Sequence, residues 1–401
     1  NTIMEASSHG LVQNRLDGLK FSSGIFTNLS HDHLDYHKSY KDYLNSKLHL
    51  FKKLLNRNSN IITDLNIPEY KKIKSIALEK NLNLHTISDK YGDLSIISHE
   101  YNGEKQLVKI KYKKKIYNFE LNLIGKIQLK NVLISMIASH LSNINFENIV
   151  NFIHKLKPVY GRLEKVGSIK NNSSVILDYA HTPDALKTCL QNIKDQFKSK
   201  RISLVFGCGG DRDKFKRPSM GKIANEYCDR IYLTDDNPRN EDPKKIRISI
   251  SKKINKSKLY DISNRGKAID QAIQDLSTGE ILVVAGKGHE QIQDYGKFKN
   301  FFSDKNCILR SIKKKNKILK NDFKFNILKE VSKNKNLLIK AKIKKASINS
   351  KEIKKNDIFF AIKGKKNDGN KFVLHSFKRK ASLAVVNKIQ NKLNKSRQIE
   401  V

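Results

Sequence analysis

A short polar stretch, TDDNPR at residues 234–239, directly follows an apolar run that ends at Leu233. It places two carboxylates, a carboxamide and a guanidinium around a rigid proline, in a chain with a net charge of +40. A solvated turn can have this composition. A binding loop can have it too, because a guanidinium holds a carboxylate through two parallel hydrogen bonds. What lies beside the stretch in the fold decides between these alternatives.

Three other polar stretches also follow apolar runs: DYAHTPD, GCGGDRDKFKRP and AGKGHE. The runs predict strands at 175–180, 202–207, 230–234 and 280–286. The segments between them predict helices at 183–196, 218–228, 243–254 and 264–276. Such alternation is typical of a mostly parallel sheet with helices on both faces, in which ligands bind beyond the carboxyl ends of the strands. The four polar stretches are therefore predicted to meet at one edge and form a site.

The residue types in these loops suit a small zwitterionic ligand. Arg212 and Arg239 could bind carboxylates, and Glu290 could accept a hydrogen bond from an ammonium group. Gly286 and Gly288 permit a close approach of the backbone. The glycines at 207–210 do not form GxGxxG, and a plain glycine-rich turn is the alternative there.

A histidine-rich stretch, HDHLDYH at residues 31–37, suggests metal binding. Tyr36 separates Asp35 from His37, so the spacing does not fit a zinc hydrolase of the HxHxDH type. One or two of these side chains as Mg²⁺ or water ligands is the favoured interpretation. Because Mg²⁺ prefers oxygen, Glu5 is the expected complementary carboxylate.

Composition limits the class of protein. With 401 residues, 38% hydrophobic and 29% charged, the chain should form two or three globular domains. It has no run of eighteen apolar residues and opens without a signal peptide, on Asn1 instead of Met, which suggests a missing start. Four widely spaced cysteines without a CxxC pair indicate free thiols in a reducing compartment, the cytoplasm.

The basic charge raises the alternative of a nucleic-acid-binding module. Residues 301–401 hold 29 Lys and Arg against 7 Asp and Glu. Lysine is, however, interleaved with asparagine and isoleucine throughout, which is typical of compositional drift and not of a binding patch. We therefore expect no nucleic-acid partner, and keep a basic RNA-associated module without enzymatic activity as the rival hypothesis.

Six motifs occur in order: MEASSHGLVQNRLDGLKFSSGIFTNLSHDHLDYH, YGRLE, DYAHTPDAL, FGCGGDRDKFKRP, TDDNPR and VVAGKGHE. With them the sequence resembles the Mur ligases of peptidoglycan synthesis over residues 1 to about 312, and DNPR is similar to the signature of the members that add diaminopimelate. SINSKEIKKNDIFFAIKGKKNDGNKF (347–372) is similar to the first domain of a Mur ligase, as in the D-alanyl-D-alanine-adding enzyme; a basic linker that mimics this domain is the alternative.

The resemblance implies an α/β fold with an incomplete central ATPase domain, a Rossmann-like domain with a mostly parallel sheet, and a partial small α/β domain. The corresponding residues are 1–160 for the ATPase domain, 161–312 for the amino-acid-binding domain, 313–325 for a charged linker, and 326–401 for the start of a second Mur ligase.

The resemblance also implies a reaction. ATP, with Mg²⁺, would phosphorylate the D-glutamate carboxylate of UDP-N-acetylmuramoyl-L-alanyl-D-glutamate, and the amine of meso-diaminopimelate would attack the acyl phosphate. A sister enzyme that adds L-lysine is the alternative; diaminopimelate differs from lysine by one carboxylate, and a buried Arg239 without that partner would be left unpaired. Other enzymes of peptidoglycan synthesis are possible partners.

Site residues follow from the motif matches. Those implied to contact the UDP-muramoyl dipeptide are Ser7, Gln13 and Arg15. Those implied to hold Mg²⁺ are Glu5, His33 and Lys47, the last as a carbamate. Those implied to contact the nucleotide are Asn131, Arg162 and Asp178. Those implied to line the diaminopimelate pocket are Arg212, Asp236, Asn237, Pro238, Arg239, Gly286 and Glu290. Those implied to be catalytic are Lys47, His33, Arg162 and His181.

Two departures from the family pattern bear on nucleotide binding. No GxxxxGK[ST] occurs in the sequence, and the phosphate-binding loop is expected to precede Asn1, so these 401 residues alone are predicted to be inactive. In the adenine-side motif, GKIQLKN at 125–131, Gln128 replaces the first asparagine while Asn131 is retained.

Overall fold

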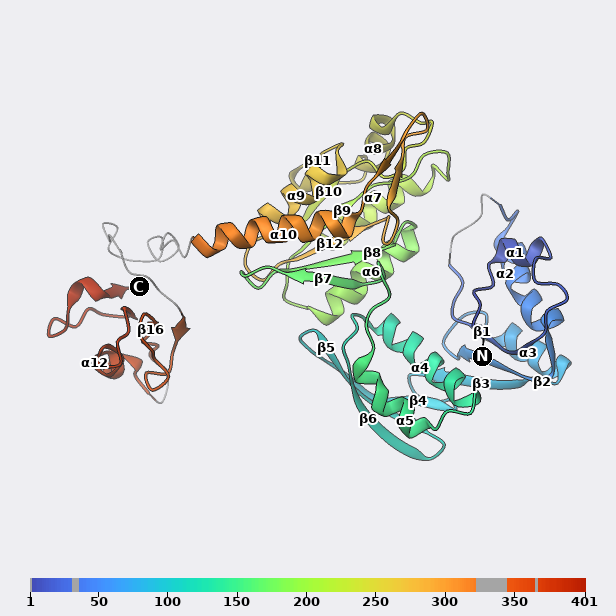
Figure 1. Cartoon of the computed structure of the whole chain (residues 1–401), viewed down its shortest axis with the longest axis horizontal. Coiled ribbons are helices and arrows are strands. Elements are labelled where there is room, and N and C mark those ends of the chain that lie inside the picture. Colours follow the sequence, from blue (N-terminus) through green and yellow to red (C-terminus); the bar gives the residue numbers. More distant parts are fainter. Residues whose placement is uncertain (1, 31–35, 322–344, 365–366) are drawn as a thin grey trace. The chain divides into compact units, whose positions relative to one another are not determined.

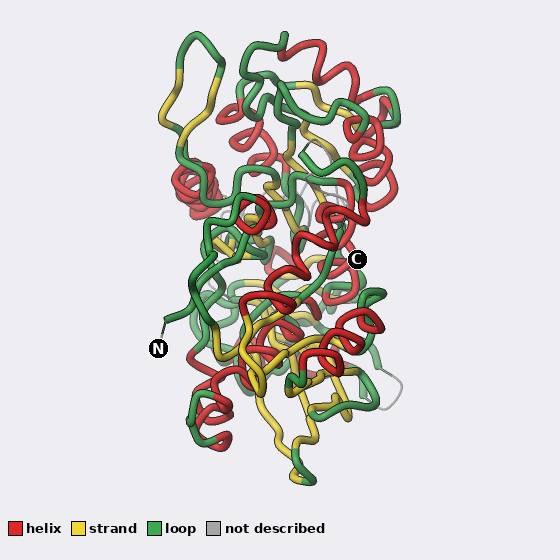
Figure 2. The backbone as a smooth tube through the Cα atoms, turned by 90° about the vertical axis from the view of Figure 1, so that its right-hand side faces the viewer, coloured by secondary structure: helices red, strands yellow, loops and turns green. Residues whose placement is uncertain are grey.

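The structure is a computed structural model that describes residues 2–30, 36–321, 345–364 and 367–401. The chain forms two compact units, Asn1–Lys315 and Asn316–Val401. Strands alternate with helices through most of it (Figure 1), and the turned view again shows strands lying among helices (Figure 2). The predicted α/β class is therefore confirmed.

The first part of the large unit is built on a six-stranded sheet in the order β1-β2-β3-β4-β5-β6. Strands β1 to β4 are parallel, and β4, β5 and β6 form an antiparallel meander. The strands are Phe21–Phe26, Leu55–Asp64, Asn83–Ser88, Leu94–Asn102, Lys105–Tyr112 and Lys115–Leu121. The helices are α1 Ser8–Val12, α2 Tyr40–His49, α3 Tyr70–Lys80, α4 Lys126–Leu141 and α5 Phe146–Phe152.

The second part of the large unit carries the predicted parallel sheet, in the order β11-β10-β9-β12-β8-β7. Only β7 at the edge is antiparallel to its neighbour. The strands are β7 Glu164–Ser168, β8 Ser174–Asp178, β9 Ile202–Phe206, β10 Arg230–Leu233, β11 Leu259–Asp261 and β12 Ile281–Ala285. The helices are α6 Pro183–Gln196, α7 Lys216–Tyr227, α8 Pro243–Ser251, α9 Arg265–Asp275 and α10 Asp304–Asn321. A short hairpin, β13 Ile292–Asp294 and β14 Lys299–Phe301, follows β12.

Helices cover both faces of this sheet because its central strands are apolar on both sides. Every residue of β8, β9 and β12 is buried. Apolar residues of α6, α7 and α8 pack into one cluster with the sheet, whereas α9 and α10 lie together on the other face (Figure 1). Helix α6 shows why these segments are helical: Thr182 caps its first turn, Pro183 follows, and Leu186, Leu190 and Ile193 form its buried stripe.

Within the predicted linker at 313–325, residues 313–321 continue helix α10, and residues 322–325 lie outside the described residues. The division between the two compact units falls after Lys315, inside the predicted range. Lys315 explains why the helix persists there. Its buried ammonium donates to the backbone oxygens of Ile273, Gln274 and Leu276 at 2.9, 3.0 and 2.6 Å, at the carboxyl end of α9. The charged composition of this segment therefore belongs to an amphipathic helix.

The small unit has a four-stranded parallel sheet in the order β15-β16-β17-β18. Its elements are β15 Ala346–Ser347, β16 Ile358–Phe360, α12 Val373–Lys378, β17 Leu383–Val386 and β18 Gln398–Glu400. In the part of the chain that the structure describes, no helix combines the length and the apolar character needed to cross a membrane. All four cysteines are buried free thiols, as predicted.

Candidate active site

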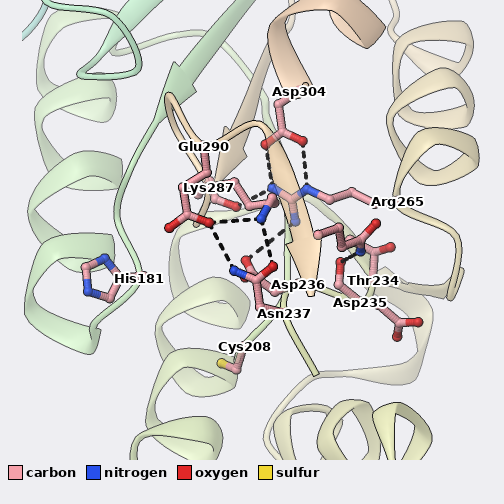
Figure 3. A network of polar contacts seen from close by, with 12 residues as sticks. His181, Cys208, Thr234, Asp235, Asp236, Asn237, Arg265, Lys287, Glu290 and Asp304 are labelled. Atoms are coloured by element: carbon pink, nitrogen blue, oxygen red, sulfur yellow. Dashed lines mark hydrogen bonds and ion pairs between the residues drawn. The ribbon is translucent and has the colours of Figure 1, made fainter. Parts of the chain in front are cut away.

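The loops after β8, β9, β10 and β12 meet at the carboxyl edge of the sheet, as the sequence predicts. Asn237 joins three of them: its backbone oxygen accepts from Gly210 N at 2.9 Å, and its Nδ2 donates to Glu290 Oε2 at 3.0 Å. The fourth loop is joined through Tyr179, whose hydroxyl donates to Glu290 Oε1 at 3.2 Å. Residues from four separate segments therefore form one polar cluster, and Figure 3 shows the part of it around Asn237, Lys287 and Glu290.

Lys287 lies at the centre of this cluster and was not singled out in the sequence. Its side chain is 0% exposed, and its Nζ donates to Asn237 Oδ1, Glu290 Oε2 and the backbone oxygen of Ile292 at 2.9, 2.9 and 2.7 Å. Burial by itself raises the pKa of the Glu290 carboxyl, but the hydrogen bonds from Lys287 and Asn237 hold it below its ordinary value. Glu290 is thus kept as a carboxylate while 32% of its side chain remains exposed.

Arg265, at the start of α9, is a second buried cation that sequence reasoning missed. Its Nε and Nη2 donate to the two carboxylate oxygens of Asp304, each at 2.7 Å, and Nη2 also donates to Ala285 O at 2.9 Å. Its Nη1 is buried without a hydrogen-bond partner in the described structure and lies 3.9 Å from Asp236 Oδ2 (Figure 3). Arg265 therefore connects the β10 and β12 loops to α10.

Glycine is required where the loops touch. A Cβ on Gly210 would lie 1.8 Å from the backbone oxygen of Pro238, and one on Gly286 would lie 2.7 Å from Asp236 Oδ2. Gly286 also has a φ of 111°, in the region that favours glycine. These two residues let the β9 and β12 loops approach the DNPR segment closely.

Arg239 stands in a conformation that is unusual for a residue with a side chain. Its φ is 52°, its backbone N donates to Asp294 O at 3.0 Å, and its Nη1 donates to Gly210 O at 2.6 Å. The sequence predicts a buried Arg239, whereas the structure shows that this residue is only half-buried. Among the described residues, no carboxylate forms an ion pair with it, so its guanidinium keeps donors for an anionic ligand.

An ion pair missed in the sequence holds the β9 loop on the β10 loop. Arg217 donates through Nη1 and Nη2 to the two oxygens of Glu241, at 3.0 and 2.9 Å. Asp211 N also donates to Glu241, at 2.7 Å. The hydrogen bond from Arg217 is the main reason why the pKa of Glu241 is lowered to about 2. Arg212, predicted to bind a carboxylate, is an exposed residue of the same loop.

The predicted nucleotide contacts near β8 have different surroundings. Both oxygens of Asp178 accept backbone N–H groups, from Leu163 at 2.7 Å and from Ala180 at 2.8 Å, and burial raises its pKa. Arg162 is exposed, with its Cζ 4.6 Å from the centre of the Tyr179 ring. His181 Nδ1 lies 3.0 Å from Tyr179 O, and its ring stands apart from the network in Figure 3. Asp178 thus fixes the turn that presents Arg162.

The adenine-side motif lies at the first turn of α4, which is closed by side chains of α6. Gly125 N donates to Gln196 Oε1 at 2.8 Å, and Ile127 N donates to Asn192 Oδ1 at 3.0 Å. Gln128, the residue that departs from the motif, donates through Nε2 to Arg162 O at 3.1 Å. Asn131 is exposed on the same helix. An exposed amide on this helix suits a base edge, and its contact with adenine stays a prediction.

The residues predicted to contact the UDP-linked substrate lie around α1. Ser7 caps this helix by accepting from Gly10 N at 3.1 Å, and Gln13 Nε2 donates to the hydroxyl of Tyr36 at 3.3 Å. Glu5 and Arg15 are exposed nearby in sequence. The four predicted residues of this segment are therefore exposed to solvent.

The predicted Mg²⁺ ligands are only partly within the described residues. His31, His33 and Asp35 lie outside them. His37 is buried with its Nε2 3.0 Å from Ser8 Oγ, so it packs within the fold. Lys47 is half-buried near the end of α2, with Nζ 5.3 Å from the centre of the Tyr43 ring. Among the described residues no three acidic, histidine or cysteine side chains form a metal-binding group, and the Mg²⁺ set of Glu5, His33 and Lys47 stays a prediction.

Comparison with known families defines the class. Residues 1–139 match the model of the Mur ligase middle domain, and residues 161–288 match the Mur ligase, glutamate ligase domain. These two matches account for most of the chain, which therefore belongs to the Mur ligase family.

Two curated relatives carry the name of one type of Mur ligase. A UDP-N-acetylmuramoyl-L-alanyl-D-glutamate–2,6-diaminopimelate ligase of Rickettsia montanensis is 39% identical over 312 residues, which are 78% of this chain and 64% of the relative. The enzyme of the same name from Chelativorans sp. (strain BNC1) gives the same identity and the same coverage. The chain thus spans 64% of the length of these relatives.

Solved structures agree with the fold. A structure of a UDP-N-acetylmuramoyl-L-alanyl-D-glutamate–2,6-diaminopimelate ligase is 31% identical with a TM-score of 0.54, covering 77% of this chain and 64% of that one. The MurF ligase of Thermotoga maritima in complex with ADP has a TM-score of 0.57 and covers 78% of this chain and 66% of that one. At 14% identity the second likeness shows the fold alone.

Proposed function

We propose that the protein is an ATP-dependent ligase that adds meso-2,6-diaminopimelate to UDP-N-acetylmuramoyl-L-alanyl-D-glutamate in peptidoglycan synthesis in the cytoplasm. The observation that carries this proposal is Arg239. Its guanidinium has no carboxylate partner among the described residues and stands in the same loop as Asp236 and Asn237. Relatives that are 39% identical bear the name of that ligase.

The site offers groups of both signs to an amino acid. Arg239 supplies guanidinium donors for a carboxylate, and Glu290 supplies a partly exposed carboxylate for an ammonium group. Diaminopimelate carries such a pair at each end, whereas lysine lacks the second carboxylate. A half-buried guanidinium whose donors are left without an acceptor disfavours lysine.

ATP would supply the phosphoryl group that activates the D-glutamate carboxylate for attack by the amine. We assign Asn131, Arg162 and Asp178 to the nucleotide side, with Arg162 presented by the turn that Asp178 fixes. Mg²⁺ would be held by Glu5, His33 and the carbamate of Lys47. His181 and Arg162 both contact Tyr179, His181 at the backbone oxygen and Arg162 at the ring. Ser7, Gln13 and Arg15 would contact the UDP-linked dipeptide. That residues 326–401 begin a second Mur ligase stays a prediction from the motif at 347–372.

Calorimetric titration of the 401-residue chain with meso-diaminopimelate and with L-lysine tests the proposal. Diaminopimelate should bind more tightly, and Arg239→Lys should weaken its binding roughly tenfold to a hundredfold, because a charge-assisted hydrogen bond contributes about 1.5–3 kcal/mol. Arg201→Lys, at an exposed position before β9, is the matched control. Equal dissociation constants for the two amino acids would count against the assignment and favour the lysine-adding alternative.

A further inference from the structure

Lys287 is the buried side chain that helps to fix which way the Asn237 amide points, together with Asp294 N and Glu290. Asn237 Oδ1 accepts two hydrogen bonds, from Lys287 Nζ at 2.9 Å and from Asp294 N at 3.0 Å. Both of these groups are donors only. If the amide were rotated by 180°, its NH₂ group would face them both, and Glu290 Oε2 would lose the hydrogen bond from Asn237 while keeping the one from Lys287. The surrounding hydrogen bonds therefore allow one orientation, with Oδ1 toward Lys287.

This orientation fixes the chemistry at the half-buried side of Asn237. Of the two hydrogens on Nδ2, one is used on Glu290 Oε2 at 3.0 Å, and the structure assigns no partner to the other among the described residues. Glu290 keeps 32% of its side chain exposed. A donor and an anionic acceptor thus stand side by side, on adjacent loops, as a pair.

Such a pair matches one end of an amino acid. The N–H donor of Asn237 suits a carboxylate, and the Glu290 carboxylate suits the neighbouring ammonium group. Reversing the amide would place two acceptors side by side and remove the preference for a carboxylate. The type of ligand group that Asn237 and Glu290 can bind therefore depends on Lys287, which is too deeply buried to contact a ligand from solvent.

We propose that Lys287 is a positioning residue for the zwitterionic end of diaminopimelate, an inference that rests on the proposed function. Lys287 holds Asn237 with its free N–H donor toward the ligand and holds the Glu290 carboxylate beside it.

A second buried lysine of the same unit shows what a structural role alone looks like. Lys315 is 7% exposed and also donates to three acceptors, but all three are backbone oxygens of α9 and the loop after it. Loss of either ammonium should reduce stability. Only loss of Lys287 should change how the amide of Asn237 is oriented.

The experiment is a double-mutant cycle on the full 401-residue chain. Lys287→Met, Asn237→Ala and the double variant are titrated with meso-diaminopimelate and with L-lysine, with Lys315→Met as the matched control. Lys287→Met removes the charge while keeping a long unbranched side chain in the buried space. We expect Lys287→Met to weaken diaminopimelate binding roughly tenfold to a hundredfold, and to reduce the preference over lysine.

The cycle also separates positioning from stability. The effects of Lys287→Met and Asn237→Ala should add only in part, because Lys287 acts through Asn237 and also holds Glu290 in place. Lys315→Met should lower the unfolding midpoint but keep the wild-type preference. If Lys287→Met keeps that preference, or its effect adds fully to that of Asn237→Ala, the inference is wrong while the proposed function stands. If the wild-type chain binds neither amino acid, the proposed function fails and the inference with it.

Discussion

Replacing Asp304 by asparagine should destabilise the large unit more than any change of a surface carboxylate. Asp304 is the only carboxylate among the described residues that hydrogen-bonds Arg265, through two bonds of 2.7 Å. Both side chains are 0% exposed. The nearest other anion, Asp236, lies 3.9 Å from a different nitrogen of the guanidinium. Asp304→Asn therefore leaves a fully buried cation without a bonded counter-charge.

The expected loss follows from the burial. Removing one partner of a buried ion pair costs about 3–5 kcal/mol, because the remaining charge stays desolvated. Part of this loss comes from helix α10, since Asp304 lies in its first turn, where a negative charge contributes about 0.3–1 kcal/mol. Asparagine keeps one acceptor oxygen but turns an NH₂ group toward the guanidinium, so we expect a value within that range.

Urea unfolding followed by far-ultraviolet circular dichroism or tyrosine fluorescence measures the change. The chain has 14 tyrosines and no tryptophan, so the fluorescence signal reports tyrosines alone. Asp270→Asn is the matched control: Asp270 pairs with Lys314 at 3.0 Å, and the two side chains are 33% and 60% exposed. An exposed pair of this kind contributes about 0–1 kcal/mol.

Two results would refute the reasoning. One is an Asp304→Asn variant that loses no more free energy of unfolding than Asp270→Asn. The other is a double variant, Arg265→Met with Asp304→Leu, that is less stable than Asp304→Asn alone. An apolar pair of similar volume should remove the uncompensated charge and recover part of the loss.

Two further predictions concern the loops of the site. The pKa of Glu241 is lowered from 4.5 to about 2, so its stabilising effect is complete above pH 4.5 and is lost as the pH falls through about 2. Glu241→Gln should flatten the decline of the unfolding free energy in this window, whereas the exposed Glu226→Gln should not; parallel curves would contradict the role of Arg217. Gly210→Ala should abolish diaminopimelate binding, because its Cβ would lie 1.8 Å from Pro238 O. Gly364→Ala, whose Cβ would meet its nearest atom at 3.4 Å, should bind as the wild type does, and binding by both variants would contradict the close approach of the loops.

The alternation of apolar strands and helices was enough to predict the four central strands of the second sheet, but not its edge strands β7 and β11. Helix α6 coincides with its predicted range of 183–196, and the other three predicted helices of this sheet differ from the structure by up to three residues at an end. The meeting of the four polar loops also followed from the sequence, because the carboxyl ends of parallel strands share one edge.

Buried charges could not be predicted in the same way. Lysine and arginine are mostly exposed, and nothing local marks Lys287 or Arg265 as exceptions. Arg265 pairs with Asp304, 39 residues away, and Arg217 pairs with Glu241, 24 residues away. Such partners become visible only when the fold brings them together. The helical structure of residues 313–321 was missed for a similar reason, since Lys315 finds its acceptors at the end of another helix.

The first turn of α4 is capped by side chains of α6, and this limits how the two domains can be recombined. The donors of its first turn belong to the middle domain, whereas the acceptors, Asn192 and Gln196, belong to the glutamate ligase domain. A recombinant that exchanged one domain for that of a distant homologue would lose this cap, at about 0.5–2 kcal/mol, unless the new α6 carried suitable acceptors one turn apart. We therefore expect the joint near residue 160 to be a poor point at which to exchange one domain for a homologue's, because the two domains share the hydrogen bonds that close this helix end.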